Sequence, residues 1–247
     1  HYAQEIFEGM KAYRTADGSI QLFRPDKNMA RMNVSCERLC IPKIDEEFAI
    51  KAIKTLVEVD KDWVPSLDDT SLYIRPYIFA TDAHVGVHPA KHLTFAIILS
   101  PVGAYYPQGI APVKIFVEQK YVRAVIGGTG FTKAGANYAI SLKGQEEAAE
   151  QGYVQTLWLE RKYVEEVGSM NVFFKIDGEV ITPALVGSIL GGITRMSIIE
   201  LLQSKGYKVS ERRLSIDELV EAFKAGKLEE AWGTGTAAVI SPIGELK

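Results

Sequence analysis

Apolar residues recur at the spacing of an α-helix in three parts of the chain. Asp45 precedes the first of these runs, where its side chain can cap the helix. Ser215 and Glu218 form a capping box before the second run, and Gly226 follows that run as a helix end. The third run covers residues 196–202. The sequence therefore predicts three helices, the first of which would bury Ala49, Ile50, Ile53, Leu56 and Val57.

Between these runs lie short segments rich in β-branched residues, which is the pattern of β-strands. Asp177 and Gly178 stand between two of them as a hairpin turn. Strands and helices do not alternate strictly as in a parallel βαβ fold, so we predict an α+β protein with mixed or antiparallel sheets. The predicted strands are Leu72–Phe79, Leu93–Leu99, Val113–Val117, Val154–Leu159, Asn171–Ile176, Glu179–Ile181 and Ala237–Ile240.

A loop rich in glycine, proline and tyrosine over residues 101–109 suggests a domain boundary. We predict a small N-terminal domain over residues 1–105, an interdomain linker over 106–118 and a large domain over 119–247. The chain has no initiator Met and ends soon after a predicted strand. We therefore expect the first domain to be truncated at its start and the second at its end.

Composition and charge narrow the classes of function. Apolar residues make up 47% of the 247 residues, enough for a sizeable core, yet no apolar run reaches the ~18 residues of a membrane span. A net charge of -3 leaves no basic surplus for a nucleic-acid backbone. We expect a globular, cytoplasmic protein that binds neither membranes nor nucleic acid.

Cysteine and histidine do not indicate a metal site. Cys36 and Cys40 are too few for a disulfide framework or a thiolate zinc site, and we interpret them as reduced, partly buried residues of a helix. Three histidines between residues 84 and 92 have helical spacing, but Gly86 and Pro89 interrupt any helix there. We expect no bound metal.

Three glycine-rich segments can each bring backbone N–H groups close to an anion. Residues 127–133 match neither the dinucleotide nor the P-loop pattern, because Lys133 replaces the third glycine and does not directly follow a glycine. Residues 191–194 precede a predicted helix, whose first turn can receive a phosphate. Residues 233–236 could bring both the backbone and a threonine hydroxyl close to the same anion. Each segment alone is more often a simple turn.

Several polar side chains have two interpretations each. Arg31 can offer forked donors to a phosphate or be a solvated helix arginine. Tyr73 and Arg75 share one face of a predicted strand, which indicates either carboxylate recognition or an edge strand with its polar face in water. Of Glu165 and Glu166, only one can face a pocket on an extended backbone, so the other should be solvated.

Five segments occur in a particular order along the chain: residues 6–13, 73–76, 127–138, 166–171 and 233–237. In this order they resemble the branched-chain amino acid aminotransferases, and the resemblance covers the whole chain. It implies a fold-type IV pyridoxal-phosphate enzyme of two α/β domains with the cofactor between them.

The resemblance implies how pyridoxal 5′-phosphate would be held. Lys133 would carry the cofactor as a Schiff base and would also move a proton between the substrate Cα and the cofactor C4′. Glu166 would keep the pyridinium nitrogen protonated, so that the ring can accept electrons, and Tyr138 would hydrogen-bond to the phenolic oxygen. The phosphate ligands would be Arg31, the backbone of Ile193 and Thr194, and Thr236.

The resemblance also implies the reaction, which is transamination of L-leucine, L-isoleucine and L-valine with 2-oxoglutarate, giving branched-chain 2-oxo acids and L-glutamate. Arg75 and tyrosine hydroxyls would receive the distal carboxylate of glutamate. The working unit would be a homodimer, in which residues 85–87 of one subunit close the pocket of the other. The substrate-binding residues would be Tyr2, Phe7, Tyr73, Arg75, Val87, Tyr105, Ser169 and Ala237.

Two alternatives stay open at this level. A D-amino acid aminotransferase or an aminodeoxychorismate lyase would share Lys133 and Glu166 but not the substrate pocket, and a non-enzymatic α+β binding protein would leave Lys133 exposed. The preference among the three amino acids and the biosynthetic or catabolic direction also stay open. Residues 238–241 replace the Cys-x-x-Cys of mammalian relatives, so a thiol switch of that kind is absent.

Overall fold

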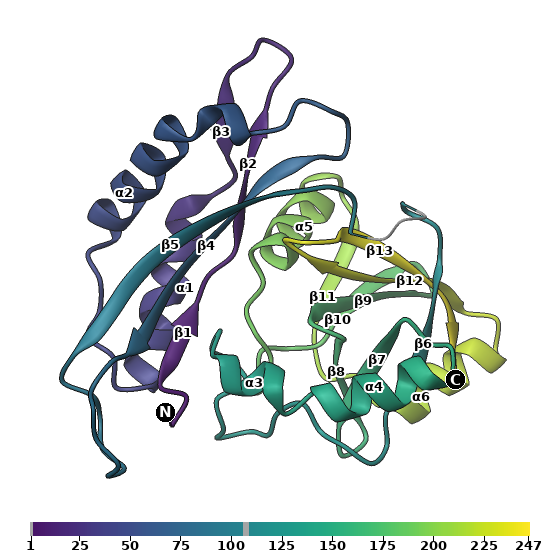
Figure 1. Cartoon of the computed structure of the whole chain (residues 1–247). Helices are drawn as coiled ribbons and strands as arrows, with labels where there is room; N and C mark the ends of the chain where they lie inside the picture. Colours follow the sequence, from purple (N-terminus) through teal and green to yellow (C-terminus); the bar gives the residue numbers. More distant parts are fainter. Residues whose placement is uncertain (1, 106–108) are drawn as a thin grey trace. The chain divides into compact units, whose positions relative to one another are not determined.

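The computed structural model describes residues 2–105 and 109–247, and the chain divides into two compact units (Figure 1). The first unit comprises His1–Tyr105 and Thr132–Ala136, and the second comprises Tyr106–Phe131 and Asn137–Lys247. The segment Thr132–Ala136, which we had predicted within the large domain, therefore groups with the first unit. The reason is a pairing between residues distant in sequence, because Ile6 forms an antiparallel bridge with Ala134.

A five-stranded antiparallel sheet forms the first unit, with β4 (Ser71–Ala80) at its centre. One edge of β4 pairs with β5 (Leu93–Val102) along its whole length. The other edge pairs with β1 (Glu5–Phe7) and β2 (Met10–Arg14), and β3 (Ile20–Leu22) follows β2. The predicted strands at 72–79 and 93–99 are confirmed. The three short strands before them were not predicted, because so few residues show no clear alternation.

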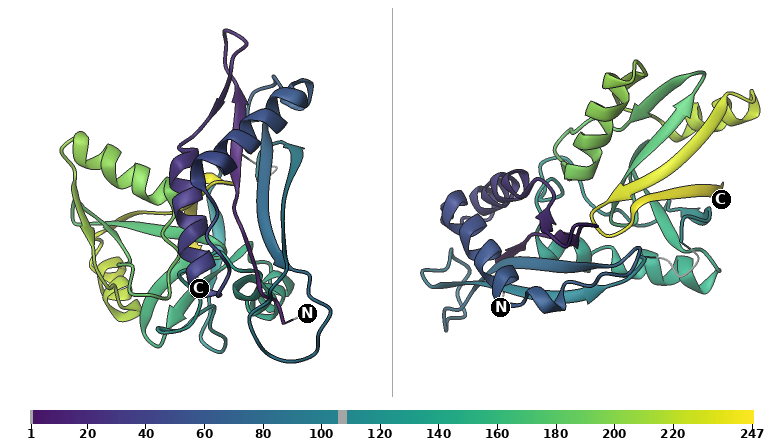
Figure 2. Two further views of the ribbon diagram at one scale, coloured as in Figure 1. Left: turned by 90° about the vertical axis from the view of Figure 1, so that its left-hand side faces the viewer. Right: turned by 90° about the horizontal axis from the view of Figure 1, so that it is seen from above.

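Two helices lie over one face of this sheet, as the views of Figure 2 show. They are α1 (Pro25–Arg38) and α2 (Glu46–Val59), and a short 3-10 helix η1 (Lys61–Trp63) follows. The predicted cap is confirmed, since Asp45 accepts a hydrogen bond of 2.7 Å from the backbone N–H of Phe48. Alternate β4 residues pack against the helices, which leaves the intervening ones on the opposite face. The core contains Ile6, Met10, Met29, Met32, Ile53, Leu72 and Ile74.

The second unit is built on a sheet in which strands close into a ring. Its order is β11-β10-β9-β12-β13-β6-β7-β8, and a further pairing of β8 with β9 closes the ring, with β10 and β11 outside it. Its helices are α3 (Gly135–Ala139), which begins in the first unit, α4 (Leu142–Glu150), α5 (Ile193–Ser204) and α6 (Ile216–Lys224). The strands are β6 (Val113–Val117), β7 (Gln155–Glu160), β8 (Tyr163–Val167), β9 (Met170–Ile176), β10 (Glu179–Thr182), β11 (Lys208–Glu211), β12 (Leu228–Gly235) and β13 (Val239–Leu246).

Local signals in this unit are confirmed where they depend on near neighbours. Ser215 accepts a hydrogen bond of 3.1 Å from the backbone N–H of Glu218 at the start of α6, and Gly226 follows its end with a positive φ of 68°. Asp177 and Gly178 join β9 to β10, and both have positive φ, as a tight hairpin turn requires.

Two predictions about this unit are wrong. The predicted linker over 106–118 contains β6, whose buried Val113 and Ile115 alternate with outward positions between β13 and β7. Residues 106–108 of that linker lie outside the described residues. Ala237 was predicted in a strand but lies in the turn between β12 and β13. Local pattern did predict the strand Val113–Val117, but its partners β13 and β7 lie far along the chain, so the sequence did not show that it belongs to the sheet.

Within the described part of the chain, no helix is long and apolar enough to span a membrane. The same residues contain no group of three or more histidine, cysteine, aspartate or glutamate side chains that could hold a metal ion. The three histidines near residue 88 lie on the loop between β4 and β5, where the rings of His84 and His88 stack at 3.9 Å.

Candidate active site

Lys133 lies in the first unit on a segment held by backbone contacts. The backbone N–H of Phe7 donates to the carbonyl of Lys133 at 3.0 Å, and the N–H of Lys133 donates to the hydroxyl of Ser35 on α1 at 3.0 Å. The Nζ atom lies 4.8 Å from the centroid of the Phe7 ring. These contacts fix the base of the lysine side chain and direct its amine along an aromatic surface.

The surroundings of this amine favour its neutral form. Burial and then the charge of Arg31 lower the pKa of Lys133 from 10.5 to about 8, with a smaller lowering by Arg75. Glu8 and Tyr73 act in the opposite direction. A fraction of the amine is therefore unprotonated near neutral pH. The alternative in which Lys133 is a merely exposed lysine is wrong.

A buried ion pair lies in the same unit. Glu8 is 0% exposed, and its two carboxylate oxygens accept hydrogen bonds of 2.8 Å from the Nε and Nη2 atoms of Arg31. The amide of Asn28 donates to the same carboxylate at 2.8 Å. The interpretation of Arg31 as a solvated helix arginine is wrong. Sequence reasoning missed Glu8, although an acid within the otherwise mainly apolar residues 6–13 was a usable signal.

Tyr73 and Arg75 lie on the face of β4 that points away from the helices. Nη2 of Arg75 donates to the hydroxyl of Tyr73 at 3.0 Å, and its guanidinium carbon lies 4.5 Å from the Phe7 ring centroid. Nε of Arg75 is buried and has no hydrogen-bond partner among the described residues. The edge-strand alternative is wrong because β4 pairs on both edges. A buried donor without an acceptor fits recognition of a carboxylate.

Gly9 is a second residue that sequence reasoning missed. A Cβ built on Gly9 would lie 2.0 Å from the hydroxyl oxygen of Tyr73. We expect Gly9→Ala to displace that hydroxyl and break its hydrogen bond with Arg75, so that kcat/KM for an amino-acid substrate falls by about tenfold, the value of one such bond. Steady-state kinetics would measure it, with Gly103→Ala as a control for folding because Gly103 has open space around it and no positive φ. Unchanged kcat/KM would contradict a role for the Tyr73 hydroxyl.

The remaining predicted residues of the first unit lie on its terminal and loop segments. The hydroxyl of Tyr2 donates to the carbonyl of Val85 at 2.7 Å, which ties the start of the chain to the loop between β4 and β5. Val87 on the same loop is 84% exposed, so it lines no buried pocket within this chain. Tyr105 is an exposed residue at the end of the first unit.

In the second unit, both adjacent glutamates of β8 are buried. Glu165 is 3% exposed and Glu166 is 4% exposed, so the prediction that one of them is solvated is wrong. Glu166 accepts a hydrogen bond of 2.8 Å from the N–H of Leu190, and its carboxylate lies 3.2 Å from Nε of Arg123. Glu165 accepts from the hydroxyl of Ser188, and burial raises its pKa. Partners from distant loops therefore cover both faces of the strand.

Arg123 is a third residue that sequence reasoning missed. Its Nη2 atom donates to the carbonyls of Gly130 and Ser188, each at 2.8 Å. It thereby connects the glycine-rich segment before Lys133 to the loop that contacts Glu166. A lone arginine before a glycine-rich stretch gave no local signal of this role.

The other predicted residues of the second unit gather near Asn171, which lies opposite Glu166 in the β8–β9 pair and opposite Thr234 in the β9–β12 pair. The amide of Asn171 donates to the carbonyl of Leu190 at 2.8 Å. Gly192, the N-cap of α5, passes so close that a Cβ there would lie 2.0 Å from Oδ1 of Asn171. This arrangement places the first turn of α5, with Ile193 and Thr194, near the strand ends that carry Glu166 and, after β12, Thr236 and Ala237.

Ser169 and Tyr138 complete the predicted set. Ser169 is exposed in the turn between β8 and β9, and Tyr138 is half-buried on α3. Asn137, beside Tyr138, accepts from the hydroxyl of Thr129 at 2.7 Å and donates to its carbonyl at 2.9 Å. These two hydrogen bonds close the loop that carries Lys133. The sequence alone does not show this structural role of Asn137.

The two cysteines differ more than their spacing predicts. Cys36 is buried on α1, whereas Cys40 lies beyond the end of that helix and is exposed, so the prediction of two helix residues is wrong for Cys40. The helix that contains Cys36, α1, also carries Arg31 and Ser35. The helix ends at Arg38, two residues before Cys40, whose positive φ belongs to the turn that follows.

We expect iodoacetamide at neutral pH to label Cys40 quickly and Cys36 very slowly. Burial raises the pKa of the Cys36 thiol to about 11, so almost none of the reactive thiolate is present. Peptide mass spectrometry of the folded protein would compare the two rates, with the unfolded protein as the control in which both react. Equal rates in the folded state would contradict the burial of Cys36.

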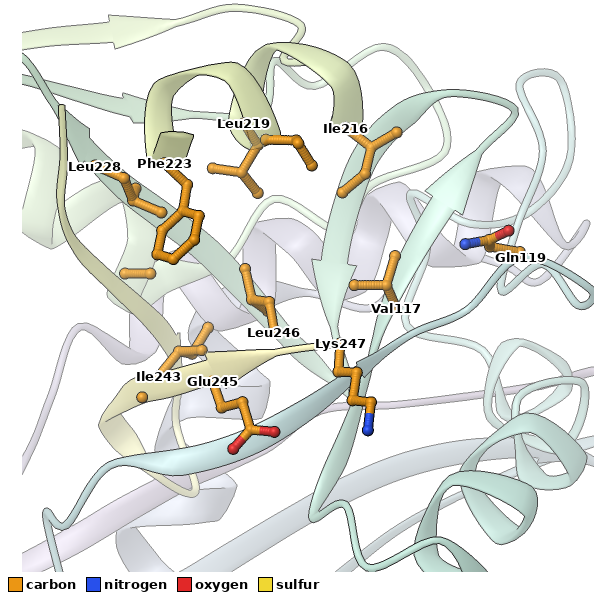
Figure 3. Close-up of a pocket in the computed structure, with 13 residues that line it drawn as sticks. Val117, Gln119, Ile216, Leu219, Phe223, Leu228, Ile243, Glu245, Leu246 and Lys247 are labelled. Atoms are coloured by element: carbon orange, nitrogen blue, oxygen red, sulfur yellow. The ribbon is translucent and has the colours of Figure 1, made fainter. Parts of the chain in front are cut away.

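A cavity of about 450 Å³ lies elsewhere in the second unit, between α6 and β13 (Figure 3). Apolar side chains of α6, including Leu219 and Phe223, face Ile243 and Leu246 across it. None of the predicted site residues lines this cavity. We therefore do not assign it to the candidate active site.

Comparison with known proteins agrees with this geometry. A family model described as amino-transferase class IV matches residues 5–246. Branched-chain-amino-acid aminotransferase 2 of Bacillus subtilis is 59% identical over 100% of this chain and 69% of its own length. Branched-chain-amino-acid transaminase 1 of the same organism is 57% identical over 100% of this chain and 70% of its own length.

Solved structures show the same fold. A branched-chain aminotransferase from Thermoproteus uzoniensis, crystallised with norvaline, has a TM-score of 0.87 at 26% identity and covers 100% of this chain and 79% of its own. The Escherichia coli branched-chain amino acid aminotransferase has a TM-score of 0.85 at 29% identity, with the same coverage of 100% and 79%. The predicted α+β class is confirmed. With a family match over nearly all of its residues, this chain belongs to the class IV aminotransferases.

Proposed function

We propose that this enzyme transfers the amino group of L-leucine, L-isoleucine or L-valine to 2-oxoglutarate, giving branched-chain 2-oxo acids and L-glutamate. The observation that carries this proposal is the desolvated amine of Lys133 beside Phe7, Tyr73 and Arg75. The names of the relatives support the substrate class. The alternatives of a D-amino acid aminotransferase and an aminodeoxychorismate lyase find no support among these names.

The cofactor of the class is pyridoxal 5′-phosphate, and the side chains present fit it. An amine with a lowered pKa suits reaction with an aldehyde, and the first turn of α5, which has no side-chain cap, suits a phosphate. When bound, the cofactor supplies an electron sink for a carbanion at the substrate Cα. We propose that it is held by Lys133, Glu166, Tyr138, Arg31, Ile193, Thr194 and Thr236.

Lys133 would move a proton between the substrate Cα and the cofactor C4′. One group can do both because its pKa, about 8, lies near the operating pH, where the two proton transfers have similar driving force. Glu166 would hold a proton on the ring nitrogen. Its carboxylate already accepts from the N–H of Leu190, which fixes its orientation.

The substrate side chains would meet a mostly apolar wall. Phe7 and Tyr73 present aromatic surface to a branched side chain, and Nε of Arg75 offers a buried donor to the distal carboxylate of glutamate. Leucine and glutamate can then use the same pocket in the two half-reactions. The other substrate contacts that we propose are Tyr2, Tyr105, Val87, Ser169 and Ala237.

We further propose that the enzyme works in the cytoplasm as a homodimer, with Val85 and Val87 of each subunit closing the substrate pocket of the other. Their exposure supports this, because two exposed valines would each gain roughly 1.5 kcal/mol on burial against a neighbour. We expect Val87→Asp to weaken both dimerisation and leucine turnover. Analytical ultracentrifugation with a leucine assay would test it, and a fully active monomer would exclude the shared site.

A transamination assay across L-amino acids and D-alanine, with 2-oxoglutarate as the acceptor, tests the proposed reaction. Turnover of L-leucine, L-isoleucine and L-valine is expected, together with absorbance of a bound cofactor that changes when L-leucine is added. Turnover of D-alanine alone would instead favour the D-amino acid aminotransferase. Absence of any bound cofactor would exclude the whole proposal.

A further inference from the structure

We propose that Glu8 is a positioning residue of this site: it fixes the guanidinium of Arg31 beside Lys133 and offsets the charge of that guanidinium. The two side chains form a buried ion pair with defined geometry. Glu8 is 0% exposed and engages Arg31 through both oxygens, and Asn28 donates to the same carboxylate. A carboxylate buried this completely is retained only where it is paired and hydrogen-bonded.

Both members of the pair are attached directly to the backbone that carries Lys133. Glu8 follows Phe7, whose N–H donates to the carbonyl of Lys133. Arg31 precedes Ser35 by one turn of α1, and the Ser35 hydroxyl accepts from the N–H of Lys133. The spacing between the lysine and this ion pair is therefore set by one backbone–backbone hydrogen bond and by the short side chain of Ser35.

The charged and titratable groups around the amine come from three sides. Arg31 on α1 and Arg75 on β4 oppose a proton on Lys133, whereas Glu8 and Tyr73 favour it. Lys11 on β2 lies in register with Tyr73 and is itself buried. Without Glu8, the guanidinium charges of Arg31 and Arg75 would act on Lys133 without the carboxylate that opposes them. The carboxylate thus keeps the lysine basic enough to accept a proton while Arg31 stays in place for an anionic ligand.

This proposal rests on the proposed function in one respect, which is that Lys133 is the base that moves a proton. Its test uses the full chain after removal of cofactor, so that it does not depend on catalysis. Trace acetic anhydride reacts with unprotonated amines, and peptide mass spectrometry would compare acetylation of Lys133 with that of exposed Lys143 over about pH 6 to 11. The pH of half-maximal labelling reports the proton affinity of each amine.

Three variants give opposed expectations. In the wild type, Lys133 should be half-labelled near pH 8. Glu8→Gln should shift this midpoint down by about one pH unit, and Arg31→Gln should shift it up by a similar amount. The double variant should return toward the wild-type midpoint, because both charges of the pair are gone. A purely structural role of Glu8 would not produce opposite shifts that cancel.

Circular dichroism would establish that each variant is folded. An unshifted midpoint in folded Glu8→Gln, or a shift of Arg31→Gln in the same direction as that of Glu8→Gln, would overturn the proposal. If Glu8→Gln does not fold, the upward shift expected for Arg31→Gln decides the matter, and its absence would overturn the proposal. Shifted midpoints in a protein without transaminase activity would support the role of Glu8 and contradict the proposed function.

Discussion

Replacement of Lys133 by methionine is expected to lower kcat for L-leucine by roughly 10⁴-fold, the upper range for loss of a general acid-base group. Methionine retains a long unbranched side chain beside Phe7 but has no amine to bind a cofactor or to move a proton. Lys143→Met is the matched control, because Lys143 is exposed and pairs with Glu146 on the same helix. Its kcat should equal that of the wild type.

The site of cofactor attachment gives an independent measurement of the same prediction. Borohydride reduction of the cofactor-loaded enzyme, followed by peptide mass mapping, should place a pyridoxyl group on Lys133. Its lowered pKa leaves a larger fraction of the Lys133 amine unprotonated near neutral pH, which is the form that attacks an aldehyde. A pyridoxyl mass on Lys143 or on any other lysine would show that the assignment is wrong.

Glu166→Gln is expected to lower kcat by about 10- to 100-fold, which corresponds to the roughly 1.5 to 3 kcal/mol of a hydrogen bond to a charged group. The amide can still accept from the N–H of Leu190, but it carries no charge to hold a proton on the ring nitrogen. Glu165→Gln should change kcat little. Burial raises the pKa of Glu165, so a neutral amide resembles the form that this environment favours.

Steady-state kinetics of the two variants, with thermal unfolding as a check on folding, would decide between the neighbouring glutamates. Glu165→Ala serves as a second control, because loss of the contact with Ser188 should lower stability by about 1 to 3 kcal/mol without a comparable loss of kcat. Equal losses of kcat in Glu165→Gln and Glu166→Gln would mean that the inward face of β8 has been misassigned.

Chemical signals in the sequence located much of the candidate site. Lys133 was identified by the motif around it, and Tyr73 and Arg75 by the two-residue period of a strand, which the structure confirms as one shared face. Gly9 was missed because it matters only through its lack of a side chain, which leaves room for Tyr73, 64 positions away. No local sequence pattern indicates a close contact between residues so far apart. The loops that hold Glu166 were missed for the same reason.

The sequence by itself determined the features that depend on near neighbours. The cap at Asp45, the turn at residues 177–178 and the strand at Val113–Val117 follow from residues within a few positions of one another. Local dihedral preferences and short-range hydrogen bonds satisfy the cap and the turn, whereas the strand also needs its distant partners β13 and β7.

Only the tertiary structure decided which charged groups are buried and to which of the two units Lys133 belongs. Glu165 looked solvated because strand periodicity leaves one face open, yet Ser188 covers that face. Glu8 could be buried only because Arg31, 23 positions later, neutralises it. The unit to which Lys133 belongs was set by its pairing with β1, more than 120 positions before it. Burial of a charge requires a partner, and these partners are brought into contact only by folding.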